Sequence, residues 1–243
     1  MSTDETTTAP LPVFYHRPSP LNAERHGDVT LDAVASFDFA RTTNAVPINA
    51  VEFAAAQRDY PIVFSNDATP VAMAVLGLEE GRNLFVDRSG RWSTGCYVPA
   101  YVRRYPFIFM EAESGTEWVL CIDEAAAVVR DDGEGEVLFN GDEPAEVTKQ
   151  ALEFCTAFQR EAAVTRAFAM ALLDAGLLEP SGVNIAREGG PERALAGFQV
   201  IDETKLLALP DATLLEWRQQ GFLGPIHAQI FSAGAWAGLA ARE

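Results

Sequence analysis

The apolar positions of the chain follow two different patterns, one up to residue 139 and another from residue 144. In the first part, the apolar residues form runs of four to eight positions that are rich in Val, Ile, Phe and Tyr. Such runs favour β-strands. The runs are VPINA, YPIVFS, PVAMAVLG, NLFVD, YPFIFME and EWVLCID. We therefore expect a curved, mainly antiparallel sheet over residues 11–139.

Polar segments that contain glycine, asparagine or aspartate separate these runs. Their composition is typical of tight turns, most simply those of hairpins. The segments are residues 65–67, 80–83, 87–90 and 113–115. Two short helices are also expected here, at Ala50 to Arg58 and near Pro99 to Arg104, where proline suits a first helical turn.

From Pro144 the apolar residues recur at steps of three and four, which predicts one apolar face along a helix of about thirty residues. Pro144 suits the first turn of this helix and Gly176 its end. The residues of the face are Val147, Ala151, Phe154, Phe158, Ala162, Thr165, Phe168 and Leu172.

The remainder of the chain is predicted to be mostly helical. A loop over residues 181–192 leads to a strand, LAGFQVID, and helices follow at Pro210 to Gln220 and Pro225 to Ala240. In the last helix, we expect the apolar side chains of Phe231, Trp236 and Leu239 to pack internally rather than form a dimer contact.

The organisation predicted from these patterns is a single α+β domain over residues 11–243, because no repeat or distinctive linker divides it. Its sheet-rich part covers residues 11–139, and its helix-rich part, with one long helix, covers residues 144–240. Residues 1–10, MSTDETTTAP, are expected to form a disordered tail.

Composition and charge narrow the class of protein. The chain of 243 residues is 48% hydrophobic and 22% charged, as in ordinary globular proteins. Its net charge of −17 repels phosphate backbones and anionic lipids, so nucleic acid and membrane surfaces are not expected partners. The start of the chain lacks the pattern of a secretory signal, and no apolar run is long enough to insert into a membrane. These features predict a cytoplasmic location.

The cysteines and histidines offer little chemistry. Cys96, Cys121 and Cys155 lie among apolar neighbours without a CxxC pair, and we expect small buried side chains rather than a disulfide or zinc site. A weaker alternative combines His26 and Asp28 with the distant His227 as the two-histidine, one-carboxylate face of a non-haem iron site.

No common nucleotide-binding or hydrolase motif occurs in the chain. The glycine-containing segment at residues 187–191 is interpreted as a turn. The sequence therefore assigns no cofactor, and it sets no oligomeric state.

The segment YVPAYVRRYPFIF, residues 97–109, places Arg103 and Arg104 among aromatic residues. Adjacent side chains point to different sides of a strand or helix, so the two arginines cannot have the same role. One interpretation is structural: a buried arginine needs a carboxylate, and Asp123 and Glu124 end a neighbouring predicted strand. The other is that an arginine holds an anion, because its planar fork matches carboxylate and phosphate groups.

Two further sets of residues complete the candidates. Tyr101 and Tyr105 join the arginines and acids as candidate ligand-binding residues, and Tyr97 and Trp92 are further aromatic contact candidates. In the segment from Asn44 to Phe64, the polar residues are interpreted as turn and capping groups. These polar residues are Asn44, Asn49, Glu52, Arg58 and Asp59.

The order of segments resembles that of the SapC family of bacterial proteins, from about Val13 to Trp236. The strings that carry the resemblance are Glu24-Arg25-His26, FDFARTTNAVPINAVEFAAAQRDYPIVF, VLGLEEGRNLFVD, GRW, YVPAYVRRYPFIF, LCIDE, GFQVIDETKLLALPD and IHAQIFS. The family is associated with production or export of surface-layer proteins, and its genes often lie near TonB-dependent receptors and halogenase-like proteins. The resemblance implies an accessory role in handling a peptide or nutrient at the envelope and supplies no catalytic residues.

Two functions from different classes follow. The first is a non-catalytic binding or accessory protein with a protein or peptide partner. The alternative is an enzyme that modifies a small acid or peptide, in which Arg103 or Arg104 orients a carboxylate and Asp123, Glu124 or His26 has an acid–base or metal-binding role. A non-haem iron oxygenase would be one such enzyme. We prefer the first, because the spacings of common catalytic sites are absent from the chain.

Overall fold

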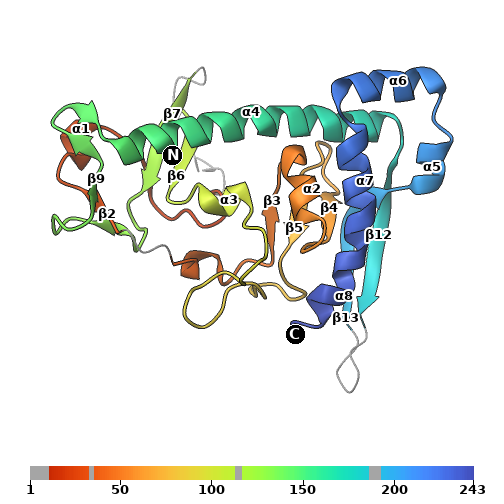
Figure 1. Ribbon diagram of the computed structural model, residues 1–243, viewed down its shortest axis with the longest axis horizontal. Coiled ribbons are helices and arrows are strands. Elements are labelled where there is room, and N and C mark those ends of the chain that lie inside the picture. The colour runs from red at the N-terminus through yellow and green to blue at the C-terminus, as the bar shows by residue number, and fades with distance from the viewer. Residues whose placement is uncertain (1–10, 33–35, 113–116, 186–192) are drawn as a thin grey trace, which may run out of the picture. The chain divides into compact units, whose positions relative to one another are not determined.

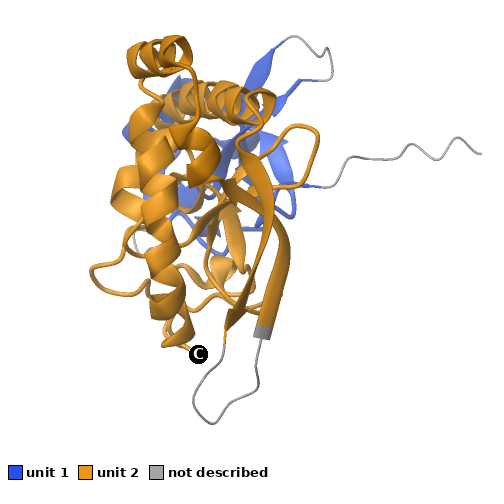
Figure 2. Cartoon of the chain, turned by 90° about the vertical axis from the view of Figure 1, so that its right-hand side faces the viewer, with its two compact units in different colours: residues 1–35, 105–150 blue, residues 36–104, 151–243 orange. Residues whose placement is uncertain are grey.

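The computed structural model describes residues 11–32, 36–112, 117–185 and 193–243. The predicted tail at residues 1–10 and the predicted turns at residues 113–115 and 187–191 lie outside the described residues. The chain divides into two compact units, and each unit is built from two separate segments (Figure 2). Unit 1 contains residues 1–35 and 105–150, and unit 2 contains residues 36–104 and 151–243.

Unit 1 is built from small antiparallel sheets. Two of them have three strands, in the orders β1-β7-β6 and β8-β2-β9, and β10 pairs with β11 in a two-stranded sheet. The strands are β1 (Pro18–Pro20), β2 (Thr30–Leu31), β6 (Phe107–Glu111), β7 (Trp118–Asp123), β8 (Val129–Arg130), β9 (Glu136–Val137), β10 (Phe139–Asn140) and β11 (Glu143–Pro144). The short helix α1 covers Ala23–His26.

The predicted strands YPFIFME and EWVLCID pair with each other in unit 1. Strands β6 and β7 are antiparallel, with Phe107 opposite Ile122. Ile122 is fully buried, and the Tyr15 hydroxyl donates a hydrogen bond of 2.7 Å to the Phe107 carbonyl. This confirms the predicted pairing of the two strands.

Unit 2 contains an antiparallel sheet of five strands in the order β12-β13-β4-β5-β3. Its strands are β3 (Ala45–Pro47), β4 (Ile62–Ser65), β5 (Ala72–Val75), β12 (Leu178–Ile185) and β13 (Arg193–Ile201). Its helices are η1 (Asp38–Ala40), η2 (Ala50–Glu52), α2 (Phe53–Ala56), α3 (Ala100–Arg103), α5 (Glu203–Leu207), α6 (Asp211–Gln220), α7 (Leu223–Phe231), η3 (Ser232–Gly234) and α8 (Ala235–Ala240). The sheet thus combines strands from both halves of the sequence.

The predicted loop that starts at Ser181 is instead part of a strand. Strand β12 continues to Ile185 and pairs with β13, with a shift of register between Ser181 and Gly182. Because β12 is the edge strand of its sheet, it tolerates proline and an irregularity that a central strand would not. The residues Pro-Ser-Gly at 180–182 are typical of turns, so the sequence pattern indicated a loop here instead of a strand.

The predicted strand NLFVD also differs from the structure. Within residues 83–87, only Val86 forms a bridge, which joins it to Trp92. The turn between them is tight, and the Asp87 amide donates to the Arg91 carbonyl at 2.9 Å. The segment therefore forms the start of a turn rather than a strand of the sheet.

Helix α4 (Glu146–Asp174) has 29 residues, close to the predicted length. Its first residues belong to unit 1, and from Ala151 it belongs to unit 2. Within unit 2, the predicted apolar face is buried at Thr165, Phe168 and Leu172. The same face is only half-buried at Phe154 and Phe158.

Aromatic and polar contacts hold the core of unit 2 together. The Phe168 ring packs edge-on against Phe53 and Phe222, with centroids 6.2 and 5.3 Å away. Helix α7 packs on β13 (Figure 1), and its buried Gln229 joins two strands. The Gln229 amide donates to the Ile62 carbonyl at 2.9 Å and accepts from the Ile201 amide at 3.2 Å.

The prediction of an α+β fold is confirmed, since 37% of the chain is helix and 24% is strand. Among the described residues, we find no helix that is both long and apolar enough to cross a membrane. The structure has two compact units. That the two units together form one domain stays a prediction.

Candidate functional site

The six predicted site residues separate into two groups. Tyr101, Arg103 and Arg104 belong to unit 2, and Tyr105, Asp123 and Glu124 belong to unit 1. The proposed pairing of an arginine with one of these acids therefore stays a prediction. Each group is described within its own unit.

The two arginines of unit 2 are presented by the short helix α3. Pro99 precedes the first residue of the helix, and the Arg104 amide closes it by donating to the Ala100 carbonyl at 3.0 Å. Consecutive side chains of a helix diverge by about 100°. Arg103 and Arg104 accordingly line two different hollows of the surface.

The Arg103 side chain is exposed but held in place. Its Nε donates to the Val98 carbonyl at 3.0 Å, and its Nη2 donates to the Tyr97 hydroxyl at 3.2 Å. The guanidinium carbon also lies 5.2 Å from the ring centroid of Phe154, within the range of a cation–π contact.

The Arg104 guanidinium is in contact with two aromatic rings. Its central carbon lies 4.1 Å from the Tyr101 centroid and 4.4 Å from the Phe158 centroid. Tyr101 is buried, whereas Phe158 is half-buried on α4. Two ring contacts fix the position of this charge more tightly than a single contact at the surface would.

A cavity of about 170 Å³, here called the cationic hollow, lies beside Arg104. Arg166 of α4 brings a second guanidinium to its lining, and Tyr101, Phe158 and Thr165 contribute to its walls. Among the described residues that line it, none is an aspartate or glutamate. Two arginines thus line this hollow in a chain whose net charge is −17.

A second cavity of about 250 Å³, here called the apolar hollow, lies beside Arg103. Much of its lining is apolar, including Val51, Ala55, Phe154 and Ala157, and Glu161 stands at its wall. The two hollows share Asn49 and Phe158, so they are immediate neighbours.

Buried Glu52 supports the lining of the apolar hollow. Its carboxylate accepts hydrogen bonds from the amides of Asn49 and Ala100, at 3.0 and 2.7 Å, and from the Tyr97 hydroxyl at 2.9 Å. Burial, and then the negative charge of Glu52, raises the pKa of Tyr97 to about 12. Asn49 and Glu52 also form a capping box at η2, which confirms capping chemistry for these two residues.

A third cavity, of about 420 Å³, contains Arg58, Gly95, Cys96 and Tyr97 in its lining. The Cys96 sulfur lies 3.1 Å from Nη2 of Arg242. Cys96 is half-exposed, so the prediction of burial is wrong for this cysteine, which follows the left-handed Gly95 in a turn.

The other two cysteines are buried, as predicted. Burial raises the pKa of the Cys121 thiol, and it raises the pKa of the Cys155 thiol to about 11. Trp92 is likewise a core residue rather than a contact residue, since its indole is buried and donates to the Tyr60 hydroxyl at 3.0 Å.

In unit 1, Asp123 is a fully buried hydrogen-bond acceptor. It accepts from the amides of His16 and Arg17, at 3.2 and 2.7 Å, and from the Tyr105 hydroxyl at 3.1 Å. Burial and the neighbouring Asp123 charge raise the pKa of Tyr105. These contacts attach the beginning of the described chain to the end of β7.

Glu124 forms ion pairs within the same unit. Its carboxylate contacts Arg17 at 3.2 Å and accepts a hydrogen bond of 2.9 Å from Nη2 of Arg25. That hydrogen bond holds the pKa of Glu124 below its ordinary value. His26 is buried, and its Nε2 lies 3.3 Å from the Glu124 carboxylate.

The structure gives the predicted iron site no support. In the part of the chain that is described, no three or more His, Cys, Asp and Glu side chains form a group able to hold a metal ion. His26 belongs to unit 1 and is next to Glu124, while His227 belongs to unit 2 and contacts the Leu223 carbonyl at 2.7 Å.

Phe158 and Arg166 are among the residues of the hollows that were not selected from the sequence as binding residues. Phe158 was assigned only to the core-facing side of a helix, and Arg166 follows Thr165 on the same helix without any distinguishing pattern. The sequence did contain a feature that points to Phe158. It is an aromatic residue on the apolar face of a long helix, and such a face can reach the protein surface.

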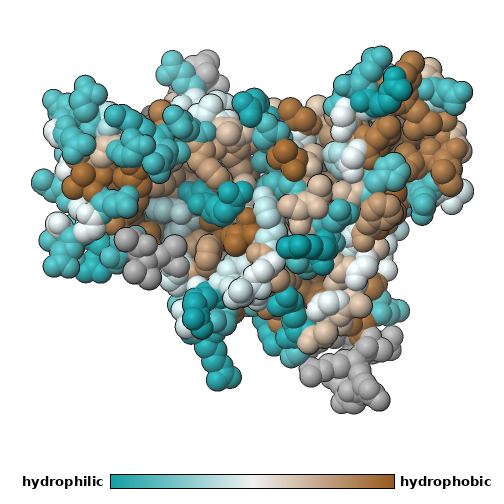
Figure 3. Space-filling view, viewed as in Figure 1, coloured by the Kyte–Doolittle hydropathy of each residue, from teal (hydrophilic) through white to brown (hydrophobic). Residues whose placement is uncertain are grey.

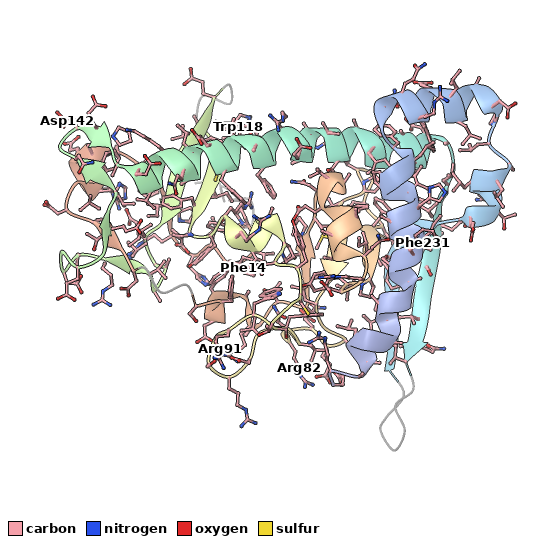
Figure 4. The ribbon with its side chains drawn as sticks, viewed as in Figure 1. Phe14, Arg82, Arg91, Trp118, Asp142 and Phe231 are labelled. Atoms are coloured by element: carbon pink, nitrogen blue, oxygen red, sulfur yellow. The ribbon has the colours of Figure 1, made fainter. Side chains whose placement is uncertain are left out.

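Apolar side chains are also exposed on α5, α6 and α7, where the hydrophobic colour gathers in Figure 3. Leu207, Leu215 and Phe231 are the exposed residues, and Figure 4 shows Phe231 on α7. Internal packing was expected for Phe231, which is wrong, because its side chain is 66% exposed. The expected internal packing is confirmed for Leu239, which is fully buried, and for Trp236, whose ring stacks on Phe198 with centroids 5.8 Å apart.

Comparison with known proteins gave one family. A family model described as SapC matches residues 21–239 of the chain. Neither the curated proteins nor the solved structures gave a match.

Proposed function

Because this chain belongs to the SapC family, we propose that it is a non-catalytic binding protein that holds a peptide or a peptide segment of a protein. The proposed binding site is the pair of neighbouring hollows in unit 2. It contains Arg103 and Arg104, two of the residues selected from the sequence, together with Phe158 between them.

One observation carries this proposal: two consecutive arginines line adjacent cavities, and aromatic rings fix both of them. An arginine that only stabilised the fold would not need to face a cavity. A guanidinium that is fixed before binding loses little conformational entropy when it meets an anion. Aromatic rings beside it supply contact area for apolar groups of the same ligand.

The polar groups around the apolar hollow favour binding over acid–base catalysis. The Glu52 carboxylate already accepts three hydrogen bonds within the protein, which leaves it poorly placed to remove a proton from a ligand. Tyr97 is protonated at neutral pH, and its pKa, raised to about 12 by burial and the charge of Glu52, makes the hydroxyl a poorer proton donor to a ligand. These groups therefore shape and support the hollow.

The proposed cellular role follows the association of the family with surface-layer proteins. We infer that the protein acts in the cytoplasm as an accessory factor, and that its partner is a peptide or protein destined for the cell envelope. The net charge of −17 supports a partner other than nucleic acid or an anionic membrane.

A panel of synthetic octapeptides with varied sequences, each made as the free acid and as the C-terminal amide, tests the proposal by calorimetric titration. At least one peptide should bind the wild-type protein. Phe158→Ala should weaken that binding by about tenfold or more, the loss expected for a buried aromatic contact residue. Circular dichroism would verify that the variant is folded.

Phe231→Ala is the matched control, because Phe231 is an aromatic residue of unit 2 that lines neither hollow. This variant should bind as the wild-type protein does. Failure of the whole panel to bind, in both chemical forms, would exclude the proposed function.

A further inference from the structure

We propose that the cationic hollow binds the terminal α-carboxylate of a peptide chain, and that the apolar hollow holds the apolar side chain of the same last residue. This inference rests on the proposed function and names the kind of ligand group that the site selects. It also assigns a binding role to Arg166.

The first argument is charge. Arg104 and Arg166 bring two positive charges to a cavity of about 170 Å³, and no acidic residue is found among its described lining residues. The chain as a whole carries a net charge of −17. Two arginines in a chain of such negative charge make this cavity the favourable place for an anion, because negative groups elsewhere on the surface repel anions.

The second argument is that the two guanidiniums are held differently. Arg104 is fixed between the rings of Tyr101 and Phe158. Arg166 is exposed, and it makes no hydrogen bond or ion pair with the rest of the described chain. Arg104 thus offers a fixed charge, while Arg166 is able to turn towards an anion with its five N–H donors available.

The third argument is size. Both cavities, at about 170 and 250 Å³, are smaller than the pockets of about 300–1,000 Å³ that enclose a whole small molecule. Each therefore suits a single chemical group. Since the hollows share Asn49 and Phe158, the two groups must be close together in the ligand.

A terminal residue meets this requirement, because its carboxylate and its side chain are attached to the same Cα atom. An internal acidic residue would place its carboxylate and a neighbouring apolar side chain on different Cα atoms, about 3.8 Å apart along the chain. The geometry points to a terminal carboxylate rather than to an internal Asp or Glu.

The apolar hollow sets the orientation. Glu52 and Glu161 line it and disfavour a carboxylate there, whereas Val51, Ala55 and Phe154 favour an apolar side chain. Val51 and Val71 are exposed, at 67% and 42%, and each lines one of the hollows. These exposed apolar residues offer contact to the preceding residues of a peptide, which a free amino acid lacks.

The experiment compares one N-acetylated hexapeptide that ends in phenylalanine as its free acid and as its C-terminal amide. Calorimetric titration should show that the acid binds at least about tenfold more tightly than the amide. This is the effect expected because the amide lacks the charged hydrogen-bond partner. Arg166→Gln should reduce this difference, since Arg104 alone then faces the carboxylate, and should leave the affinity for the amide unchanged. Because Arg166 is exposed, the variant is expected to fold.

Arg218→Gln is the matched control, since Arg218 is also an exposed helical arginine of unit 2 and lines neither hollow. This variant should retain the preference for the acid. Loss of the preference in Arg218→Gln would show a general charge effect and overturn the assignment of Arg166.

Other outcomes separate this inference from the proposed function. Equal binding of the acid and the amide would overturn the carboxylate inference but retain a peptide-binding site. Equal or tighter binding of an amidated peptide with an internal aspartate or phosphoserine would overturn it as well. If neither form of any peptide binds, both proposals fail.

Discussion

Tyr97 lies between a negative and a positive group, and its single hydroxyl contacts both. The hydroxyl donates to Glu52 at 2.9 Å and accepts from Arg103 at 3.2 Å. The donation to Glu52 is possible only while the phenol carries its proton, whereas the contact with Arg103 uses only the phenol oxygen as acceptor. At the scale of single residues, this chain of three groups connects buried Glu52 to the exposed arginine of the apolar hollow.

The protonation of Tyr97 gives a pH-dependent prediction. Its pKa rises from 10.0 to about 12 in the folded protein, so the unfolded chain loses this proton at a lower pH than the folded one. The linked stabilisation is complete below pH 10 and is lost as the pH rises towards about 12. In Tyr97→Phe, the free energy of unfolding should fall less steeply across this window, as measured by urea titrations at several pH values.

The wild-type slope will also contain contributions from Tyr60 and Tyr105, whose pKa values are raised as well. The comparison with Tyr97→Phe removes only the contribution of Tyr97. Identical slopes for the two proteins between pH 10 and about 12 would show that Tyr97 titrates as it does in the unfolded chain.

The sequence predicted some of these residue-scale features and not others. Turn and capping roles were expected for the polar residues between Asn44 and Phe64 because each needs a hydrogen-bond partner among apolar neighbours, and Asn49 and Glu52 form a capping box. The rings around Arg104 could be predicted only in part. Tyr101 is a near neighbour in the chain, but Phe158 comes from another helix, and local pattern does not reveal which distant elements meet.

At the scale of elements, the sequence pattern identified the long helix and several strands correctly. It failed where residues typical of turns also occur in an edge strand. Strand β12 contains Pro180 and Gly182, which occur more often in turns, but its edge position and its shifted register accommodate both. The end of α6 at Gln220 was predicted correctly, because the next residue is Gly221 and glycine most readily takes a left-handed conformation after a helix.

Gly221 and Gly238 form a matched pair for a stability prediction. Gly221 has φ of +78°, whereas Gly238 lies inside α8, and an added Cβ atom would meet no other group within 4 Å at either position. Gly221→Ala should therefore lower the free energy of unfolding by about 1–2 kcal/mol, the cost of a left-handed alanine. Gly238→Ala should raise it by about 0.5–1 kcal/mol, because alanine favours a helix interior.

Urea unfolding followed by circular dichroism would measure both changes. Since neither substitution creates a collision, the difference between them reports the backbone conformation alone. A similar change of the same sign in both variants would contradict this explanation.

At the scale of the whole molecule, the chain passes between the two units three times. The passages lie at residues 35–36, 104–105 and 150–151, and the last of them falls inside α4. This division was not predicted, because no change in composition marks the passages and each unit combines segments that are distant in sequence. The fold class and the family resemblance were predicted correctly, because they rest on patterns that extend along most of the chain.

The predicted single domain leads to a test of cooperativity. Helix α4 contributes residues to both units without interruption, so we expect that neither unit unfolds alone. Hydrogen exchange followed by mass spectrometry in increasing urea should show that β6 and β7 of unit 1 lose protection at the same midpoint as β4 and β5 of unit 2. Two separate midpoints would establish two domains that fold independently.

The different burial of the three cysteines has a practical consequence. Cys121 and Cys155 are buried with raised thiol pKa values, whereas Cys96 is half-exposed beside Tyr97. Maleimide reagents react with accessible thiolates, so the natural chain should accept a fluorophore at Cys96 ahead of its other thiols. Because Tyr97 lines both the third cavity and the apolar hollow, such a dye would report directly on what enters the neighbouring site.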